Sequence, residues 1–143
     1  MTNGHPQVEP DIKRRSETEM SDYPKGIKRL LREYLSEAYE RELRRELTRL
    51  DESFAEWRRG EISNRKLDDR IHEYETGPAR ALYKAYNYGP ADMAVAYAVV
   101  VGVLDQEEVP KELLEAIERP INFYRSLQER NELRDRKGRW WSG

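Results

Sequence analysis

The feature that most constrains the fold of this chain is one long run of helical apolar periodicity. Pro24 suits a first helical position, and Gly60 marks the end of the run. Apolar side chains recur every three or four residues between them: Ile27, Leu30, Leu31, Tyr34, Leu35, Ala38, Tyr39, Leu43, Leu47, Leu50, Phe54 and Trp57. We predict a single helix here that extends roughly 50 Å, at about 1.5 Å per residue, and is longer than those that follow.

The last part of this helix predicts an interaction surface. Leu43, Leu47, Leu50, Phe54 and Trp57 alternate spacings of four and three residues, like a coiled-coil seam, and an antiparallel hairpin with the next helix explains the pattern as well. Because the helix is so long, we expect Leu47, Leu50, Phe54 and Trp57 to lack a complete partner within the chain. A second copy of the chain or a partner protein would then cover them.

A second and a third helix follow. Ser63 is placed as an N-cap, and Ile62 before it and Leu67 after it form a hydrophobic staple. This second helix is predicted to stop near Gly77 and Pro78, because proline lacks the amide that would continue it. Pro78 then opens a third helix, which ends in a turn after Asn87.

The fourth helix is predicted to be the most buried. It begins at Pro90, and its run from Met93 to Leu104 is apolar on every side. Five valines also suit a strand, but the alanines and the length of the run favour a helix. We expect the other helices to enclose it.

A final helical stretch follows a short turn. Residues 105–108 resemble a capped turn, Pro110 starts an acidic helix, and Pro120 breaks or kinks it before a last stretch that reaches Leu127. The fold class is therefore all-α: a single helical bundle of about five helices over residues 23–130, with a long first helix and a buried Ala/Val-rich fourth helix.

The two ends of the chain differ from the bundle. Residues 1–22 hold few large apolar groups, which predicts a disordered leader. Residues 131–143 form a basic aromatic tail in which Arg134, Arg136, Lys137, Arg139, Trp140 and Trp141 outweigh Glu132 and Asp135. Arg139, Trp140 and Trp141 are candidates to bind a protein groove or to stack on bases. The alternative is that the tryptophans fold back on the bundle or form a tolerated end.

Composition excludes several classes of function. The chain has 143 residues and no cysteine, so it forms no disulfide and holds no thiolate metal site. We expect the reducing cytoplasm as its location. Charged residues make up 38 % of the chain but leave a net charge of only −2. The longest apolar stretch is shorter than the roughly 20 residues that a membrane span needs, so we expect no membrane partner.

The charges of the first helix predict a solvated face. Arg29, Arg32, Arg41, Arg44, Arg45 and Arg49 interleave with Glu33, Glu37, Glu40, Glu42 and Glu46 at spacings of three and four residues. Such spacings favour salt pairing along the helix surface over a phosphate-binding stripe.

The sequence shows no strong catalytic or cofactor motif. No glycine-rich phosphate loop is present, and His72 is the single histidine in the predicted bundle. We therefore predict no cofactor and no metal, although Asp68 and Asp69 precede His72 on one helical face and leave a weak single metal site as an alternative to a solvated acidic face. Four tyrosines form a further group, which fits either a small-molecule pocket or ordinary core packing: Tyr83, Tyr86, Tyr88 and Tyr97.

One pair of residues resembles a family motif. Arg65 and His72 lie on one predicted helix, and an arginine followed after a few residues by a histidine resembles the motif of HEPN-type ribonucleases, which are helical dimers. The spacing is at the long limit of that pattern, and Lys66 stands where a small polar residue is expected. The resemblance implies that the arginine binds phosphate and the histidine assists attack by a ribose hydroxyl.

We therefore expect a non-enzymatic interaction module or accessory subunit that acts through its first helix and its tail. A nucleic-acid-associated protein that uses the tail is the first alternative, and a HEPN-like ribonuclease that uses Arg65 and His72 is the second.

The nucleic-acid alternative makes a prediction of its own. If the basic tail binds phosphates, affinity for a nucleic acid falls steeply as salt rises and is lost when the residues after Asn131 are removed. Filter binding across a salt series measures both effects, and an affinity that is insensitive to salt would contradict this alternative.

Overall fold

The computed structural model describes residues 22–136, and within this range it confirms the all-α fold class, with helices and no strand. The elements are α2 (Lys25–Arg58), α3 (Asn64–Tyr74), a π turn η1 (Glu75–Ala79), α4 (Arg80–Asn87), α5 (Ala91–Val101), a 3-10 turn η2 (Gln106–Glu108), α6 (Lys111–Ala116) and α7 (Glu118–Glu129). No helix among these is long and apolar enough to cross a membrane.

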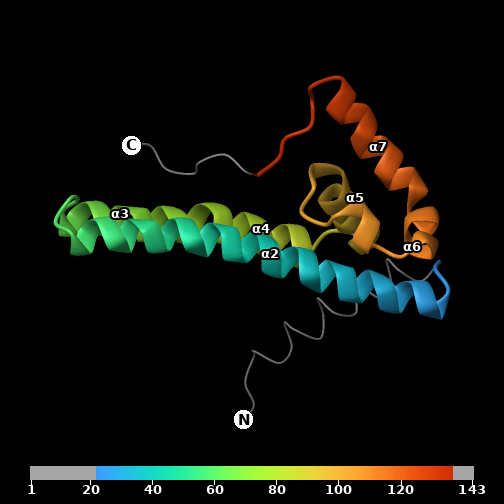
Figure 1. Ribbon diagram of the computed structural model, residues 1–143, viewed down its shortest axis with the longest axis horizontal. Helices are drawn as coiled ribbons and strands as arrows, with labels where there is room; N and C mark the ends of the chain where they lie inside the picture. The colour runs from blue at the N-terminus through green and yellow to red at the C-terminus, as the bar shows by residue number, and fades with distance from the viewer. Residues whose placement is uncertain (1–21, 137–143) are drawn as a thin grey trace, which may run out of the picture.

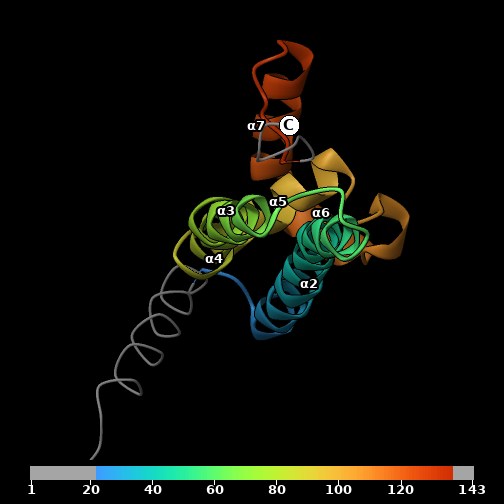
Figure 2. The ribbon, with the colours of Figure 1, turned by 90° about the vertical axis from the view of Figure 1, so that its left-hand side faces the viewer.

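An antiparallel hairpin dominates the shape. The 34 residues of α2 run beside α3, η1 and α4, which return along its length, and the remaining helices gather at one end of this rod (Figures 1 and 2). At the other end, α2 and α3 are the only helices of residues 22–136, and they pack against each other. We call this two-helix end, residues 47–74, the arm.

The hydrophobic core lies at the bundle end and is centred on α5, as the apolar run predicted. Six of the eleven residues of α5 are buried, and they pack against α2 and α7. The core takes in Leu31 and Ala38 from α2, and Leu43 is the last residue of α2 that packs against it. The arm therefore extends beyond the core.

The predicted helix end at Gly77 and Pro78 is wrong. The chain continues from α3 into α4 without a break, and Pro78 lies buried inside the π turn. Pro78 has no amide hydrogen to donate, and a π turn absorbs this defect by taking one extra residue into a single turn. The Thr76 hydroxyl donates to the His72 carbonyl at 2.9 Å and helps to satisfy the backbone there. The second side of the hairpin is therefore one continuous helical segment, from α3 through η1 to α4.

The predicted caps are confirmed. Ser63 Oγ accepts from the amide of Lys66 at 3.0 Å at the start of α3. Asp105 and Glu108 form a reciprocal capping box around η2. The predicted break near Pro120 falls three residues earlier, at Ile117 between α6 and α7, since Pro120 is tolerated in the first turn of a new helix.

The structure describes only part of the predicted leader and of the predicted basic tail. The leader lies outside the described residues apart from Asp22, and so do Arg139, Trp140 and Trp141. Residues 131–136 are described, and they return from α7 to the hairpin, where Arg136 contacts α2.

Gly102 directly follows α5, and its left-handed backbone conformation leads to a prediction about stability. Its φ is +87°, a conformation that costs an L-residue about 1–2 kcal/mol, and its added Cβ would meet no atom within 4 Å. Gly102→Ala should therefore lower the free energy of unfolding by that amount, as measured by urea denaturation. Gly26→Ala is the control: it lies in α2 with equal space and should raise stability by roughly 0.5 kcal/mol. Equal effects of the two substitutions would contradict the backbone explanation.

Candidate functional site

A buried carboxylate on α2 organises the middle of the hairpin. The side chain of Glu42 is 1 % exposed, and it accepts two hydrogen bonds from Arg136, at 3.1 Å from Nε and 2.6 Å from Nη2. The hydroxyl of Tyr86 on α4 and Nη2 of Arg45 also donate to it. A buried charge is tolerated only when it is paired and hydrogen-bonded in this way.

Arg136 is held on more than its charge. Its guanidinium lies 4.3 Å from the centre of the Tyr97 ring and 5.7 Å from that of Tyr86. Its carbonyl accepts from Arg45 Nη2 at 2.9 Å, and the Tyr97 hydroxyl donates to the Arg134 carbonyl at 2.9 Å. The segment after α7 is thus fastened to α2, α4 and α5 together.

The electrostatics of this cluster fix the charge of Glu42. Burial alone would raise the pKa of the Glu42 carboxyl, but the hydrogen bonds from Arg136 and Tyr86 outweigh it and lower the pKa. Burial and the neighbouring carboxylate raise the pKa of Tyr86. Glu42 is therefore an anion, and hydrogen-bond donors occupy the lone pairs of its carboxylate oxygens. This arrangement suits a structural ion pair and not proton transfer.

This cluster corrects two expectations from the sequence. Glu42 was assigned to a solvated face, but it is buried, as is Glu46, which pairs with Arg45 and Arg49 at 3.2 and 3.1 Å. The available signal was that Ala38, Glu42 and Glu46 follow one another at four-residue spacing on the buried face. Arg136 was assigned to a basic tail, but its guanidinium forms an ion pair with Glu42. A deletion that begins after Arg136 therefore tests the tail without breaking the ion pair.

One side of the arm continues this polar chemistry. Ser53 and Arg70 are buried, and Arg70 Nη1 donates to Ser53 Oγ at 3.1 Å and to Glu56 Oε1 at 3.0 Å. We call the side that carries Arg49, Glu56 and Arg70 the polar side of the arm. These polar contacts join α2 to α3, and Leu67 of α3 is buried in the arm as well.

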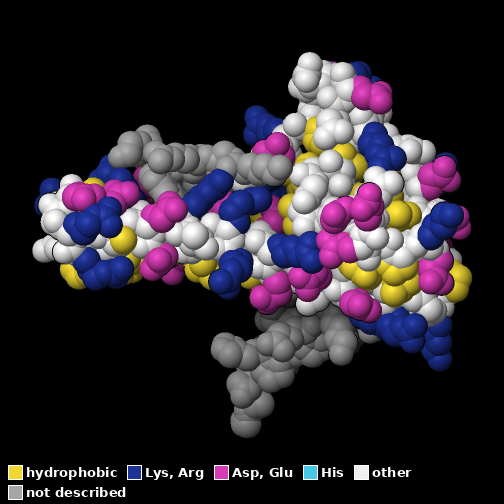
Figure 3. Space-filling view, in the orientation of Figure 1, with side chains coloured by type: hydrophobic (Ala, Val, Ile, Leu, Met, Phe, Trp, Pro, Cys, Tyr) yellow, Lys and Arg dark blue, Asp and Glu magenta, His cyan; other side chains and the backbone are white. Residues whose placement is uncertain are grey.

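The predicted partner-binding residues of α2 face away from that side. Leu47 is 48 % exposed, and Leu50 and Phe54 are half-buried against α3, outside the core. Ile71 of α3 is half-buried as well. We call Leu47, Leu50, Phe54 and Ile71 the apolar side of the arm. Hydrophobic side chains also show along the lower edge of the hairpin in Figure 3, interleaved with charges.

Trp57 lies at the tip of the arm. Its side chain is 39 % exposed, and its indole Nε1 donates to Asn64 Oδ1 at 2.7 Å, across the turn between α2 and α3. Trp57 therefore fastens the turn and still presents part of its ring to the surface. Of the four predicted contacts on α2, Leu47 and Trp57 are the more exposed.

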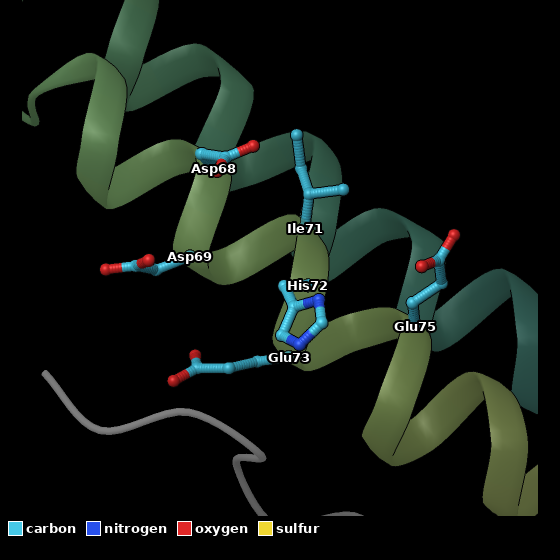
Figure 4. A pocket seen from close by; sticks show the side chains of 6 residues that line it. All are labelled: Asp68, Asp69, Ile71, His72, Glu73 and Glu75. Atoms are coloured by element: carbon cyan, nitrogen blue, oxygen red, sulfur yellow. The ribbon is translucent and has the colours of Figure 1, made fainter.

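The side chains around His72 on α3 do not point toward a common centre. Arg65 and His72 are both exposed and lie about two helical turns apart, roughly 10 Å along the axis. In Figure 4, Asp69 and Glu73 point to one side of α3 and Ile71 and Glu75 to the other. Residues 22–136 contain no group of three or more side chains able to hold a metal ion, and this range includes Asp68, Asp69 and His72.

The four tyrosines do not line one pocket. Tyr86 and Tyr97 belong to the Glu42 cluster, whereas Tyr83 and Tyr88 are exposed and pack edge to face with ring centres 5.7 Å apart. A pocket of about 180 Å³ does lie between Tyr97, Tyr124 and Arg136. It is smaller than the roughly 300 Å³ at which small-molecule sites begin.

Comparison of the chain with protein-family models, with curated protein sequences and with solved structures finds no match. A function for the chain therefore has to be inferred from its own surface.

The ion pair between Glu42 and Arg136 predicts that the free energy of unfolding depends on pH. Because the pKa of Glu42 is lower in the folded chain than the usual value of about 4.3, its contribution is present above that value and is lost as the pH falls through the folded pKa. Glu42→Gln should lower the free energy of unfolding by about 1.5–3 kcal/mol at neutral pH. The difference between variant and parent should shrink as the solution is acidified, as measured by urea denaturation at several pH values.

The matched control is Glu33→Gln, an exposed glutamate of the same helix. It should change stability by less than about 0.5 kcal/mol at every pH. A Glu42→Gln deficit that stays constant down to low pH would contradict an ionised Glu42.

Proposed function

We propose that the protein is a non-enzymatic interaction module that binds another protein through the apolar side of its arm. The observation that carries the proposal is Leu47. This leucine is 48 % exposed. It begins a row of apolar residues on α2 that lies beyond Leu43, the last residue of this helix that packs against the core.

The architecture of the arm supports this proposal. Two antiparallel helices cannot enclose apolar residues that lie beside their line of contact, and a third helix packed along both would do so. Leu47, Leu50 and Phe54 follow at spacings of three and four residues, the repeat that an incoming helix uses for its own anchors.

Site-specific photo-crosslinking tests the proposal directly. A photoreactive residue at position 47, introduced into the full chain in its native cell, should crosslink to one protein in high yield. The same residue at Ser36, an exposed position on the bundle half of α2, is the control and should not. Identical products from both positions, or none from position 47, would contradict the proposal.

Leu47→Gln separates binding from folding. Leu47 is half exposed and lies outside the core, so its replacement should lower the free energy of unfolding by less than about 1 kcal/mol. The yield of the crosslinked or co-purified partner should fall at least about tenfold, the loss of roughly 1.4 kcal/mol of binding free energy. A variant that retains its partner would show that Leu47 is an ordinary exposed leucine.

A further inference from the structure

We propose that the segment that binds the arm is an amphipathic helix of another protein with lysine or arginine residues beside its apolar face. This inference rests on the proposed function and adds the chemistry of the partner. It depends on which charges border the apolar side of the arm.

The contacts of Arg70 establish the two sides. Successive residues of a helix are rotated by about 100°. From the buried Ser53, Glu56 lies about 60° one way around α2, whereas Leu50 and Phe54 lie about 60° and 100° the other way. Arg70 donates to both Ser53 and Glu56, which places all three on the line of contact or the polar side. Leu50 and Phe54 are therefore on the opposite side.

The same reasoning places Ile71. Viewed from one end, two antiparallel helices turn in opposite senses. The step from Ser53 to Phe54 on α2 and the step from Arg70 to Ile71 on α3 therefore lead to the same side of the hairpin. Phe54 and Ile71 thus share one apolar surface, with Leu50 between them and Leu47 nearer the bundle.

Three carboxylates border this surface. Asp51 follows Leu47 by one turn on α2, and Asp68 and Glu75 lie about one turn before and after Ile71 on α3. Figure 4 shows Ile71 and Glu75 on the side of α3 opposite Asp69 and Glu73. All three carboxylates are exposed, and none of them forms an ion pair with another described residue. The basic residues on this side, Arg44 and Arg58, lie towards its two ends.

This charge pattern selects between the possible occupants. If a second copy packed its arm on this surface about a two-fold axis, the carboxylates at the centre of each arm would face those of the other, which costs free energy. A helix with basic flanks meets the same carboxylates with opposite charge. Its apolar anchors would contact Leu47, Leu50, Phe54 and Ile71, which cover about two turns.

Two designed peptides serve as probes. Both carry the same leucine repeat on an amphipathic helix, one with lysines and the other with glutamates beside the apolar face. Fluorescence anisotropy with the full chain should show the lysine peptide binding at least about tenfold more tightly at low salt. This preference should shrink as salt screens the exposed charges.

Charge reversal with a matched control locates the effect. The triple variant Asp51→Lys, Asp68→Lys, Glu75→Lys should shift the preference to the glutamate peptide. The control triple variant Glu33→Lys, Asp69→Lys, Glu73→Lys changes the net charge equally but away from the apolar side of the arm, because Glu33 lies on the bundle half of α2 and Asp69 and Glu73 lie on the opposite side of α3. It should retain the preference for the lysine peptide. Equal responses of the two variants would show attraction to the net charge alone and would overturn the inference.

The remaining outcomes separate this inference from the proposed function. Binding of both peptides with equal affinity, abolished by Leu47→Gln, would overturn the basic partner and leave the arm as a binding surface. Failure of both peptides to bind, together with no crosslink from position 47, would overturn both. Sedimentation that shows a dimer dissociated by Leu47→Gln would make a second copy the occupant and would also overturn the basic partner.

Discussion

The ion pair between Glu42 and Arg136 is the interaction on which the arrangement of the elements depends. It joins α2 to the segment after α7, and the tyrosines that complete it, Tyr86 and Tyr97, come from α4 and α5. Three helices and the segment after α7 thus meet at one buried ion pair. A buried pair of this kind adds little net stability compared with apolar packing, but it is costly to break, which favours one arrangement of the elements over others.

The position of this pair divides α2 into two halves with different contacts. Towards the N-terminus, the helix contributes Leu31 and Ala38 to the core around α5. Beyond Leu43 it leaves the core, and it faces α3 with polar residues on one side, through Ser53 and Arg70, and with apolar residues on the other. A helix longer than the core that it covers exposes part of its apolar face when no other element covers it, and apart from α3 no described helix lies along this part of α2. The arm is the direct result.

The proposed partner follows from this geometry. Polar contacts of Ser53, Glu56 and Arg70 join α2 to α3 on the polar side, whereas Leu47 is half exposed on the apolar side. In the proposed complex, Leu47 and its neighbours would contribute to binding, and the exposed carboxylates beside them would favour a basic partner. Under this proposal, stability and recognition would be carried by different residues of the same hairpin, and for this reason Glu42→Gln and Leu47→Gln are expected to have separable effects.

The amino-acid sequence by itself determined the helices and their caps. Periodicity defined α2, the apolar run identified α5 as the central helix, and Ser63 and Asp105 marked the starts of α3 and η2, because these signals act between residues close in the chain. The same local rules placed a helix end at Pro78, where packing along α2 keeps the hairpin straight through a π turn. Sequence spacing identified Leu47 and Trp57 as candidate contacts, but it assigned Glu42 to solvent and Arg136 to a basic tail. Only the tertiary structure decided those two roles, since a charge 94 residues away along the chain determines whether a carboxylate can be buried.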